Sequence, residues 1–244
     1  MSAKGVDVKI KNMAEMGLGY GSEYQLLRYL GHHRNELNKI IREQTRLKGE
    51  LEWLDFPKDN NRLSLDGEYK GVNFLKGKIN ECKYDELRSE WNKYWRYSQN
   101  WDGVILHKKG NSEEWIIVEA KANLEEIKSN TNSSSKQNLQ NIFQDTQKDL
   151  SIENRNWFGE YYQLANRLTF VHFLNKKGIN ASLLYIYFLN GYEKCKTNRK
   201  TVVENKSVER QEEWQNAIQE EYEKLGINSQ IEEQYISKIF IDCK

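Results

Sequence analysis

Two short apolar segments on either side of a glycine-asparagine pair constrain the fold more than any other feature of the sequence. Residues 104–106 (VIL) and 115–118 (WIIV) are rich in β-branched and aromatic side chains, which favour strands. The polar residues between them centre on Gly110 and Asn111, a pair typical of two-residue hairpin turns. The sequence therefore predicts an antiparallel hairpin over residues 102–122.

The position of the turn fixes the register of this hairpin. If Gly110 and Asn111 form the turn, Lys109 pairs with Ser112, and counting back along both strands sets Asp102 opposite Glu119. Directly opposed residues share one face of a sheet, with their Cβ atoms about 5 Å apart. Two carboxylates are thus expected side by side at the end of the hairpin.

The same face should carry an ammonium group. Side chains alternate along a strand, so Lys121 shares the face of Glu119, while Ala120 and Ala122 point the other way and let a helix pack closely. Two carboxylates about 5 Å apart repel by about 3 kcal/mol at an effective dielectric near 20. Lys121 offsets part of this, and a divalent cation would offset more, because hard cations bind carboxylate oxygens. A plain ion pair of Lys121 with either acid is the alternative.

Periodicity and turn residues predict the remaining elements. Two segments, 51–57 and 71–75, could be short strands or loops that dock on the core. The other predicted elements are a helix over 22–46 with a break near Gly31, a helix over 83–100 whose aromatic stripe belongs to the core, a helix over 137–150, a helix over 157–174, a buried central strand over 181–189, a charged helix over 203–225 and an edge strand over 235–243.

Composition limits the classes of function. The net charge of +1 over 244 residues excludes a global basic field, so any site for a polyanion must be local. The isolated cysteines Cys82, Cys195 and Cys243 form no CxxC pair, which indicates neither a zinc site nor a disulfide framework and suits a reducing cytosol. No apolar run reaches 18 residues and no signal-peptide pattern begins the chain. We therefore expect a soluble cytoplasmic protein with no membrane partner.

These residues resemble the motif of the PD-(D/E)xK phosphodiesterase superfamily, and in particular an uncharacterised bacterial branch of it. That motif is an Asp at the start of one hairpin strand and (Asp/Glu)-x-Lys on the next, and this chain has Asp102 and Glu119-Ala120-Lys121. Trp101 occupies the position of the proline. The resemblance covers about residues 22–190. It implies an α/β fold with a restriction-endonuclease-like core, a mixed central sheet flanked by helices.

The resemblance also implies a domain organisation. Residues 1–21 would be a lead-in, residues 22–195 the nuclease core, and residues 196–244 a C-terminal helical appendage of the same domain. A homodimer contact is the other role considered for residues 203–244.

The activity implied is a metal-dependent nuclease that uses Mg²⁺ or Mn²⁺ to hydrolyse phosphodiester bonds, with DNA as the expected substrate, endonucleolytic cleavage as the expected mode and RNA as an alternative substrate. Asp102 and Glu119 would bind the metal together with the backbone carbonyl of Ala120. Lys121 would orient or deprotonate the attacking water and stabilise developing negative charge. The competing hypothesis is a non-catalytic module that keeps the fold and binds a protein or a nucleic acid.

Four further residues are candidates for supporting roles, and for each a purely structural role is the alternative. Glu23 on the first helix could add a metal ligand, as in some members of the superfamily. Gln163 and Arg167 are four residues apart on one helix, so they share a face that could approach the site or a phosphate. Gln137 could play a similar part.

Overall fold

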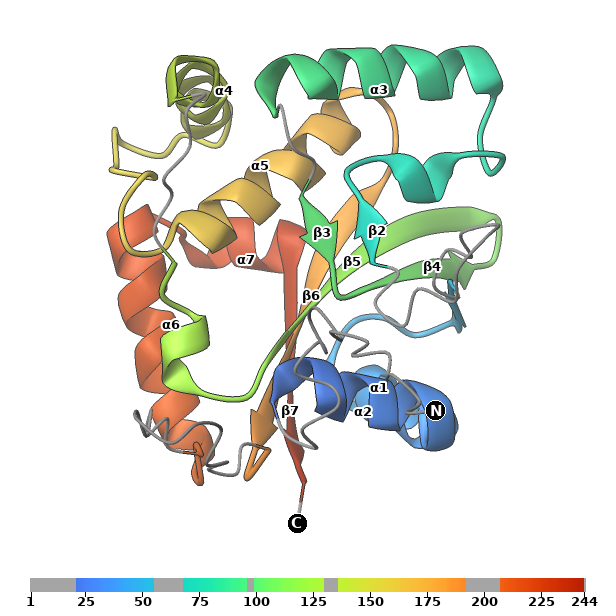
Figure 1. Cartoon of the computed structure of the whole chain (residues 1–244), viewed down its shortest axis with the longest axis vertical. Helices are drawn as coiled ribbons and strands as arrows, with labels where there is room; N and C mark the ends of the chain where they lie inside the picture. Colours follow the sequence, from blue (N-terminus) through green and yellow to red (C-terminus); the bar gives the residue numbers. More distant parts are fainter. Residues whose placement is uncertain (1–20, 55–67, 96–98, 130–135, 192–206, 244) are drawn as a thin grey trace, which may run out of the picture.

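The computed structural model describes residues 21–54, 68–95, 99–129, 136–191 and 207–243 (Figure 1). The predicted lead-in before Gly21, the loop at 130–135, Cys195 and the start of the 203–225 helix lie outside these residues. Within them no helix is both long enough and apolar enough to cross a membrane.

A mixed five-stranded sheet forms the centre of the molecule. Its strand order is β1-β4-β5-β6-β7; β1, β4 and β5 pair antiparallel, whereas β5, β6 and β7 pair parallel. A second sheet pairs two short strands, β2 and β3, just before the hairpin. The strands are β1 (Glu50–Trp53), β2 (Tyr69–Lys70), β3 (Asn100–Trp101), β4 (Gly103–Lys109), β5 (Ser112–Lys121), β6 (Ala181–Leu189) and β7 (Ile236–Asp242).

Helices cover both faces of the large sheet, which confirms the α/β class (Figure 1). The helices of one face are α1 (Ser22–His32) and α2 (Arg34–Gln44). The helices of the other face are α3 (Glu81–Tyr94), α4 (Lys136–Asp149), α5 (Tyr162–Lys176), α6 (Gln211–Leu225) and α7 (Ser229–Tyr235). The short 3₁₀ turns η2 (Asn73–Leu75) and η3 (Leu124–Glu126) complete the described elements.

The hairpin has the predicted turn and register. Gly110 has a φ of 60°, which a glycine adopts without steric cost at the first position of a tight hairpin turn. Lys109 pairs with Ser112, and the ladder runs back to the pair of Gly103 with Val118. The predicted register is therefore confirmed as far as Gly103, the residue that follows Asp102.

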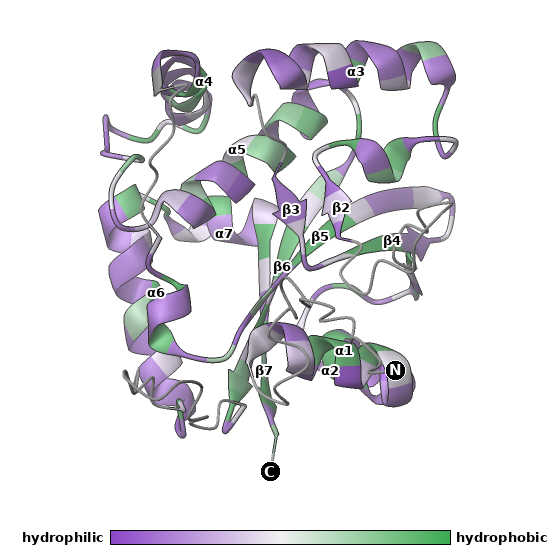
Figure 2. Cartoon of the chain, in the orientation of Figure 1, coloured by the Kyte–Doolittle hydropathy of each residue, from purple (hydrophilic) through white to green (hydrophobic). Residues whose placement is uncertain are grey.

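Each face of β5 packs into a separate core, because its side chains alternate. Trp115 and Ile117 join the core under α3 to α7, whereas Ala120 and Ala122 join the core under α1 and α2. Figure 2 shows the result: green hydrophobic residues concentrate on the central strands, and the outer surfaces of the helices are mostly purple. The small alanines let α1 lie close behind β5, as expected from the sequence.

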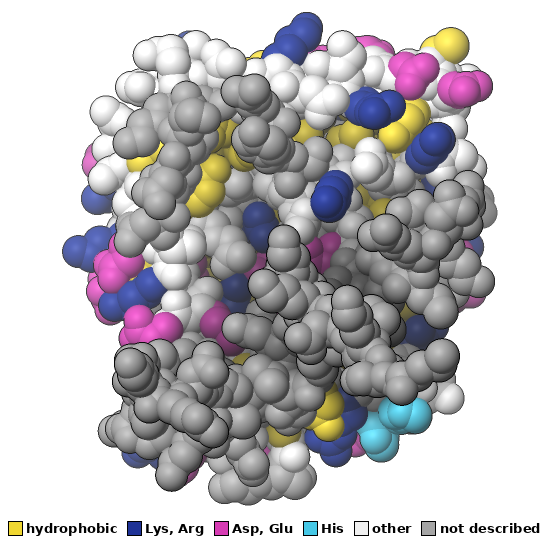
Figure 3. All heavy atoms as spheres, in the orientation of Figure 1, with side chains coloured by type: hydrophobic (Ala, Val, Ile, Leu, Met, Phe, Trp, Pro, Cys, Tyr) yellow, Lys and Arg dark blue, Asp and Glu magenta, His cyan; other side chains and the backbone are white. Residues whose placement is uncertain are grey.

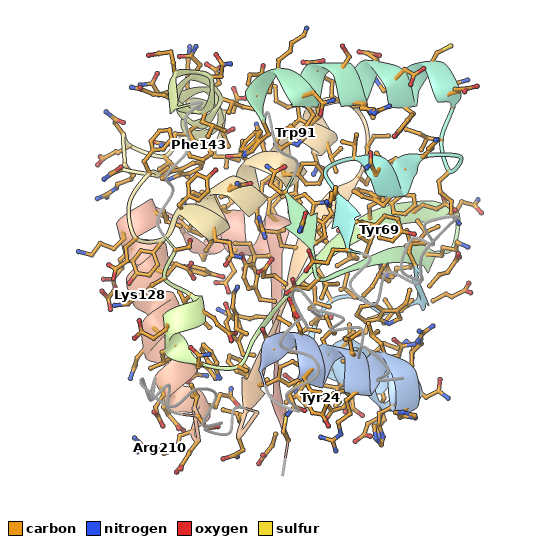
Figure 4. The ribbon with its side chains drawn as sticks, in the orientation of Figure 1. Tyr24, Tyr69, Trp91, Lys128, Phe143 and Arg210 are labelled. Atoms are coloured by element: carbon orange, nitrogen blue, oxygen red, sulfur yellow. The ribbon has the colours of Figure 1, made fainter. Side chains whose placement is uncertain are left out.

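The predicted aromatic stripe belongs to the core. Tyr84, Trp91 and Trp95 are buried, and the ring of Trp91 lies 4.9 Å from that of Phe170 on α5. Trp91 of α3 and Phe143 of α4 are labelled in Figure 4 beside α5. Ligand binding on this stripe is not needed to explain its residues, because packing accounts for them.

Several predicted boundaries are wrong. The first helix breaks at His33 rather than near Gly31, so residues 22–46 form two helices. The helix predicted from Trp157 begins at Tyr162, because the indole of Trp157 is buried and donates to the carbonyl of Leu225 at 3.0 Å, which holds its segment in a turn. Within the described residues the charged helix begins at Gln211, and residues 207–210 before it are not helical.

The other boundary corrections concern short segments. Of the two options for residues 71–75, the structure shows the docked loop, which contains a 3₁₀ turn whose Phe74 and Leu75 are buried. The helix predicted over 83–100 occupies Glu81–Tyr94, with Asn100 in β3. The central strand over 181–189 has the predicted bounds.

The C-terminal region is not an appendage. β7 pairs with β6 from the pair of Leu183 with Ile236 to the pair of Leu189 with Asp242. It is therefore an edge strand of the main sheet, as its pattern predicted. Trp214 of α6 and Tyr235 of α7 are buried in the main core. The predicted helical appendage is therefore wrong for the described part of residues 196–244, which completes the central fold.

Candidate active site

Asp102 links the two strands of the hairpin at their open end. It occupies a bend between β3 and β4, one residue beyond the last ladder pair. Its Oδ2 accepts a hydrogen bond from the backbone nitrogen of Ala120 at 2.8 Å. This bond holds the carboxylate of Asp102 against the backbone between Glu119 and Lys121, although Asp102 itself lies just outside the ladder in which Glu119 was its predicted partner.

Glu119 and Lys121 form a buried ion pair on one face of β5. Nζ of Lys121 lies 2.7 Å from Oε1 of Glu119, and the two residues are only 5 % and 3 % exposed, respectively. A charge pair so well shielded from water is costly to form unless further hydrogen bonds complete it. Side chains two residues apart on a strand lie on the same face, which explains why Glu119 and Lys121 meet. Helix α5 supplies the additional hydrogen bonds.

Gln163 and Arg167 of α5 both contact Glu119. Nε2 of Gln163 donates to Oε1 of Glu119 at 2.8 Å, and its Oε1 accepts from Nζ of Lys121 at 2.7 Å. Nε of Arg167 donates to Oε2 of Glu119 at 3.1 Å. Both oxygens of Glu119 are therefore engaged, and the helix face predicted from the spacing of Gln163 and Arg167 lies against the charged pair.

The ring of Trp101 packs against the guanidinium group of Arg167. The guanidinium carbon of Arg167 lies 4.9 Å from the centroid of the Trp101 ring, within range of a cation–π contact. Its NH2 also donates to the carbonyl of Asn100 at 3.2 Å. Trp101 is itself fully buried, and its indole donates to the carbonyl of Gly71 at 2.7 Å. The ring of Trp101 thus helps to hold the cation that binds Glu119.

The two carboxylates of the site have opposite electrostatic environments. Burial and the charge of Glu119 raise the pKa of Asp102 well above its usual range, against the opposing effects of Lys121, the Ala120 N–H and Arg167. Burial acts in the same direction on Glu119, but Arg167 and Lys121 outweigh it and hold the pKa of Glu119 below its usual range. Paired acids whose pKa values are pushed apart are typical of functional sites.

Two buried polar residues near this pair were not anticipated from the sequence. Tyr185 of β6 is the register partner of Glu119, and its hydroxyl has no hydrogen-bond partner among the described residues. Glu221 of α6 is 3 % exposed. Burial raises the pKa of Glu221 to about 8, with Lys121 opposing and Glu119 adding to the shift. The signal for Glu221 was a charge at an apolar position of a helix, between Ile218 and Leu225.

The other two residues predicted to have supporting roles are Glu23 and Gln137. Glu23 is in the first turn of α1, which covers the face of β5 opposite Glu119, so its role as a metal ligand stays a prediction. Gln137 is exposed on α4 and donates to Asn141 at 3.4 Å. The structure does not bring Gln137 to Glu119, and its expected supporting role is not retained.

The cluster can hold a cation only through few protein ligands. In the described part of the chain, no group of three or more His, Cys, Asp or Glu side chains is arranged to bind a metal. Asp102 and Glu119 are two carboxylates, and Mg²⁺ needs only one or two because it keeps several waters. Figure 3 shows acidic and basic side chains recessed near the middle of one face of the molecule.

Comparison of the chain with protein-family models, with curated proteins and with solved structures gave no match.

Proposed function

We propose that this protein is a metal-dependent nuclease that hydrolyses phosphodiester bonds, with DNA as its substrate. The observation that carries the proposal is the convergence of Asp102, Glu119 and Lys121 from neighbouring strands, with Arg167 bound to the same glutamate. Buried charges are costly, and sites where they gather are commonly functional.

The order of the elements supports the proposal. A helical pair precedes three antiparallel strands, β1, β4 and β5; a crossover through α5 then leads to β6, which lies parallel to β5. This is the order that the resemblance to the PD-(D/E)xK superfamily implies. The motif residues occupy the end of β5 and the bend before β4, which is where that superfamily carries its site.

The donor set is compatible with Mg²⁺ or Mn²⁺. Asp102 and Glu119 offer hard carboxylate oxygens, and the backbone carbonyl of Ala120, the residue after Glu119, would be a further ligand. Burial and the charge of Glu119 raise the pKa of Asp102 despite the opposing effects of Lys121, the Ala120 N–H and Arg167, and a bound cation would further favour its charged form. When bound, the metal would contribute Lewis-acid stabilisation of the phosphate and a more acidic water.

The protein's own residues would position the reactants. Lys121, held by Glu119 and Gln163, would direct an ammonium N–H at the attacking water or at a phosphate oxygen. Arg167 would hold Glu119 in place through its bond to Oε2, backed by the ring of Trp101. Because Glu119 starts fully hydrogen-bonded, metal binding would require one of these donors to move aside.

The proposal is tested by cleavage of nucleic acids with the purified chain. Supercoiled plasmid, single-stranded DNA and RNA are each incubated with Mg²⁺ or Mn²⁺, and products are resolved on gels. We expect cleavage of DNA that stops with a chelator and falls about 100-fold or more in Asp102→Asn and Glu119→Gln. Glu113→Gln is the matched control, because Glu113 is an exposed acid on the same strand. A chain inert on every substrate would refute the proposal.

One observation favours a second candidate, a non-catalytic binding module that keeps the fold. Both oxygens of Glu119 already take hydrogen bonds from Lys121, Gln163 and Arg167, which satisfies the carboxylate without any metal. Such a module would bind no Mn²⁺. Calorimetric titration distinguishes the two candidates: a site present in the wild type and lost in Glu119→Gln supports the nuclease, and its absence supports the module.

A further inference from the structure

A cleft lies between α4 and the segment that leads into α5, apart from the carboxylates of the candidate site. Its volume is about 370 Å³, within the range of about 300–1,000 Å³ that is typical of ligand sites. Phe143, which Figure 4 labels beside α4, is one of its lining residues. The residues that line this cleft differ from those of the proposed catalytic cluster, so its ligand has to be inferred from its own chemistry.

Aromatic side chains form the inner wall of the cleft. Phe143 and Trp157 are each 1 % exposed, whereas Phe158 is half-buried. The ring of Phe158 lies 5.1 Å from that of Phe143 and is stacked on that of Tyr162, at 6.5 Å with an interplanar angle of 23°. Phe158 is therefore held by neighbouring rings and still reaches solvent. A ring placed in this way can stack with a planar ligand.

Amide side chains form the rim of the cleft. Gln140 and Gln144 lie one turn apart on α4, and Asn154 lines the cleft from the segment before α5. All three are exposed, and no hydrogen bond joins their side chains to another residue in the described part of the chain. An amide carries both donors and an acceptor, which matches the mixed donors and acceptors on the edge of a nucleobase.

The wall opposite α4 is fixed by hydrogen bonds. Gln147 is 5 % exposed; its Oε1 accepts from the backbone nitrogen of Arg155 at 2.9 Å, and its Nε2 donates to the carbonyl of Arg155 at 3.2 Å. Gly226 packs closely on the same residue, since a Cβ added there would lie 3.3 Å from Cγ of Arg155. The cleft is thus formed before a ligand arrives, which lowers the entropic cost of binding.

The charge of the cleft suits an anionic ligand. Among the described residues that line it, Arg155 is the one that carries a charge. The NH2 group of Arg155 lies 4.0 Å from Oε2 of Glu153, whose side chain is 91 % exposed, so solvent weakens this pair. The guanidinium group therefore remains able to bind a phosphate or the edge of a base.

The cleft lies within reach of the candidate active site. Gln163, which contacts both Glu119 and Lys121, comes five positions after Phe158 in the chain. Five residues span at most about 18 Å, which corresponds to about five nucleotides at a rise of about 3.4 Å each. A strand whose phosphate lies at the carboxylates can thus extend to the cleft.

We propose that this cleft binds an unstacked base of a single-stranded segment of the nucleic-acid substrate. Phe158 would stack on the base, and the groups at its edge would be those of Gln140, Gln144, Asn154 and Arg155. Amides and aromatic rings also suit a saccharide. The choice of a nucleic acid rests on the proposed nuclease function and on the cationic lining of the cleft.

The proposal is tested by binding in the presence of a chelator, which keeps metal-dependent cleavage out of the measurement. A labelled single-stranded DNA of mixed sequence is titrated with the whole chain and followed by fluorescence anisotropy. A strand of the same length without bases is the comparison ligand, because it has the same charge. We expect the strand with bases to bind about tenfold more tightly, as one stacked base would provide.

Variants then locate this preference. Phe158→Leu should remove most of it, because leucine keeps the apolar volume and loses the aromatic face, and Gln144→Ala should reduce it. The matched control is Phe240→Leu, a half-buried phenylalanine on β7 that does not line the cleft, which should leave it unchanged.

Three results would overturn the proposal. One is equal binding of the two strands by the wild type, and another is an undiminished preference in a folded Phe158→Leu. If that variant does not fold, an undiminished preference in Gln144→Ala combined with Arg155→Met has the same meaning. The third is binding of a saccharide that is lost in Phe158→Leu while the strand with bases does not bind, which would assign the cleft to sugars.

These results can be told apart from a failure of the nuclease proposal. A chain that cleaves no nucleic acid but prefers the strand with bases through Phe158 keeps the base-binding cleft and loses the catalytic assignment. A chain that cleaves DNA, with the preference unchanged in the cleft variants, keeps the nuclease assignment and loses the cleft.

Discussion

Oδ2 of Asp102 accepts the backbone N–H of Ala120 at 2.8 Å, which ties the bend before β4 to the strand that carries Glu119 and Lys121. The bond places an acid with a raised pKa next to one with a lowered pKa. Stability and activity should therefore respond in opposite directions when Asp102 is neutralised.

Asp102→Asn should stabilise the fold while it abolishes cleavage. The pKa of Asp102 is raised on folding, so the folded state favours the protonated acid, and stability is lost as pH rises through the interval between the unfolded and folded pKa values. The amide removes this penalty at neutral pH. Thermal unfolding at pH 7 should give a higher Tm for Asp102→Asn than for the wild type. A lower Tm would show that Asp102 is a stabilising structural acid.

Arg167→Met should destabilise the chain strongly at neutral pH. Removing the cation leaves Glu119 buried with one partner fewer, a change that typically costs about 3–5 kcal/mol. The lowered pKa of Glu119 contributes stability above its unfolded value that is lost as pH falls through its folded value, so the difference between variant and wild type should shrink at acid pH. Urea unfolding at pH 7 and pH 4 measures this, and an equal difference at both would contradict it.

Trp101 should matter through its ring more than through its indole nitrogen. Trp101→Phe keeps an aromatic face under Arg167 and loses the hydrogen bond to Gly71. Trp101→Leu removes both. We expect the leucine variant to lose more nuclease activity than the phenylalanine variant when both are measured at equal folded fraction, because only the ring orients the guanidinium. Equal losses in the two variants would assign Trp101 a packing role alone.

Glu221→Gln should raise stability in a pH-dependent way. The pKa of Glu221 is about 8 in the folded chain and ordinarily 4.5, so the wild type loses stability as pH rises between these values. The nearby charges are Lys121, which opposes the shift, and Glu119, which adds to it. At pH 7 the glutamine variant should be more stable by an amount on the order of 3 kcal/mol, and the difference should vanish near pH 4. Urea titrations across this range measure both values.

The sequence was sufficient for the features that depend on local pattern. Gly110 sets the turn, and the turn sets the register as far as the pair of Gly103 with Val118; the bond from Ala120 to Asp102 lies just beyond this ladder. The apolar run of β6 has the predicted bounds because a strand buried on both faces reads as a continuous apolar segment. The spacing of Gln163 and Arg167 likewise predicted that the two share a helix face.

The features that could not be predicted from the sequence depend on long-range contacts. Trp157 fits a helical pattern, yet its bond to Leu225 on α6 keeps it in a turn. Glu221 lies on α6, and only the docking of α6 on β6 buries it in the core. Gln137 is a polar residue of the kind expected in a supporting role, but the position of α4 leaves it exposed.

Diffraction from a crystal soaked in Mn²⁺ and recorded at the manganese absorption edge tests the central claim most directly. We predict one anomalous peak between the carboxylates of Asp102 and Glu119, with Lys121 or Arg167 displaced from Glu119, and no such peak in a crystal of Glu119→Gln. Density that shows Asp102 and Glu119 free of metal at saturating Mn²⁺, with every bond to Lys121, Gln163 and Arg167 intact, would contradict the assignment of a metal-dependent site.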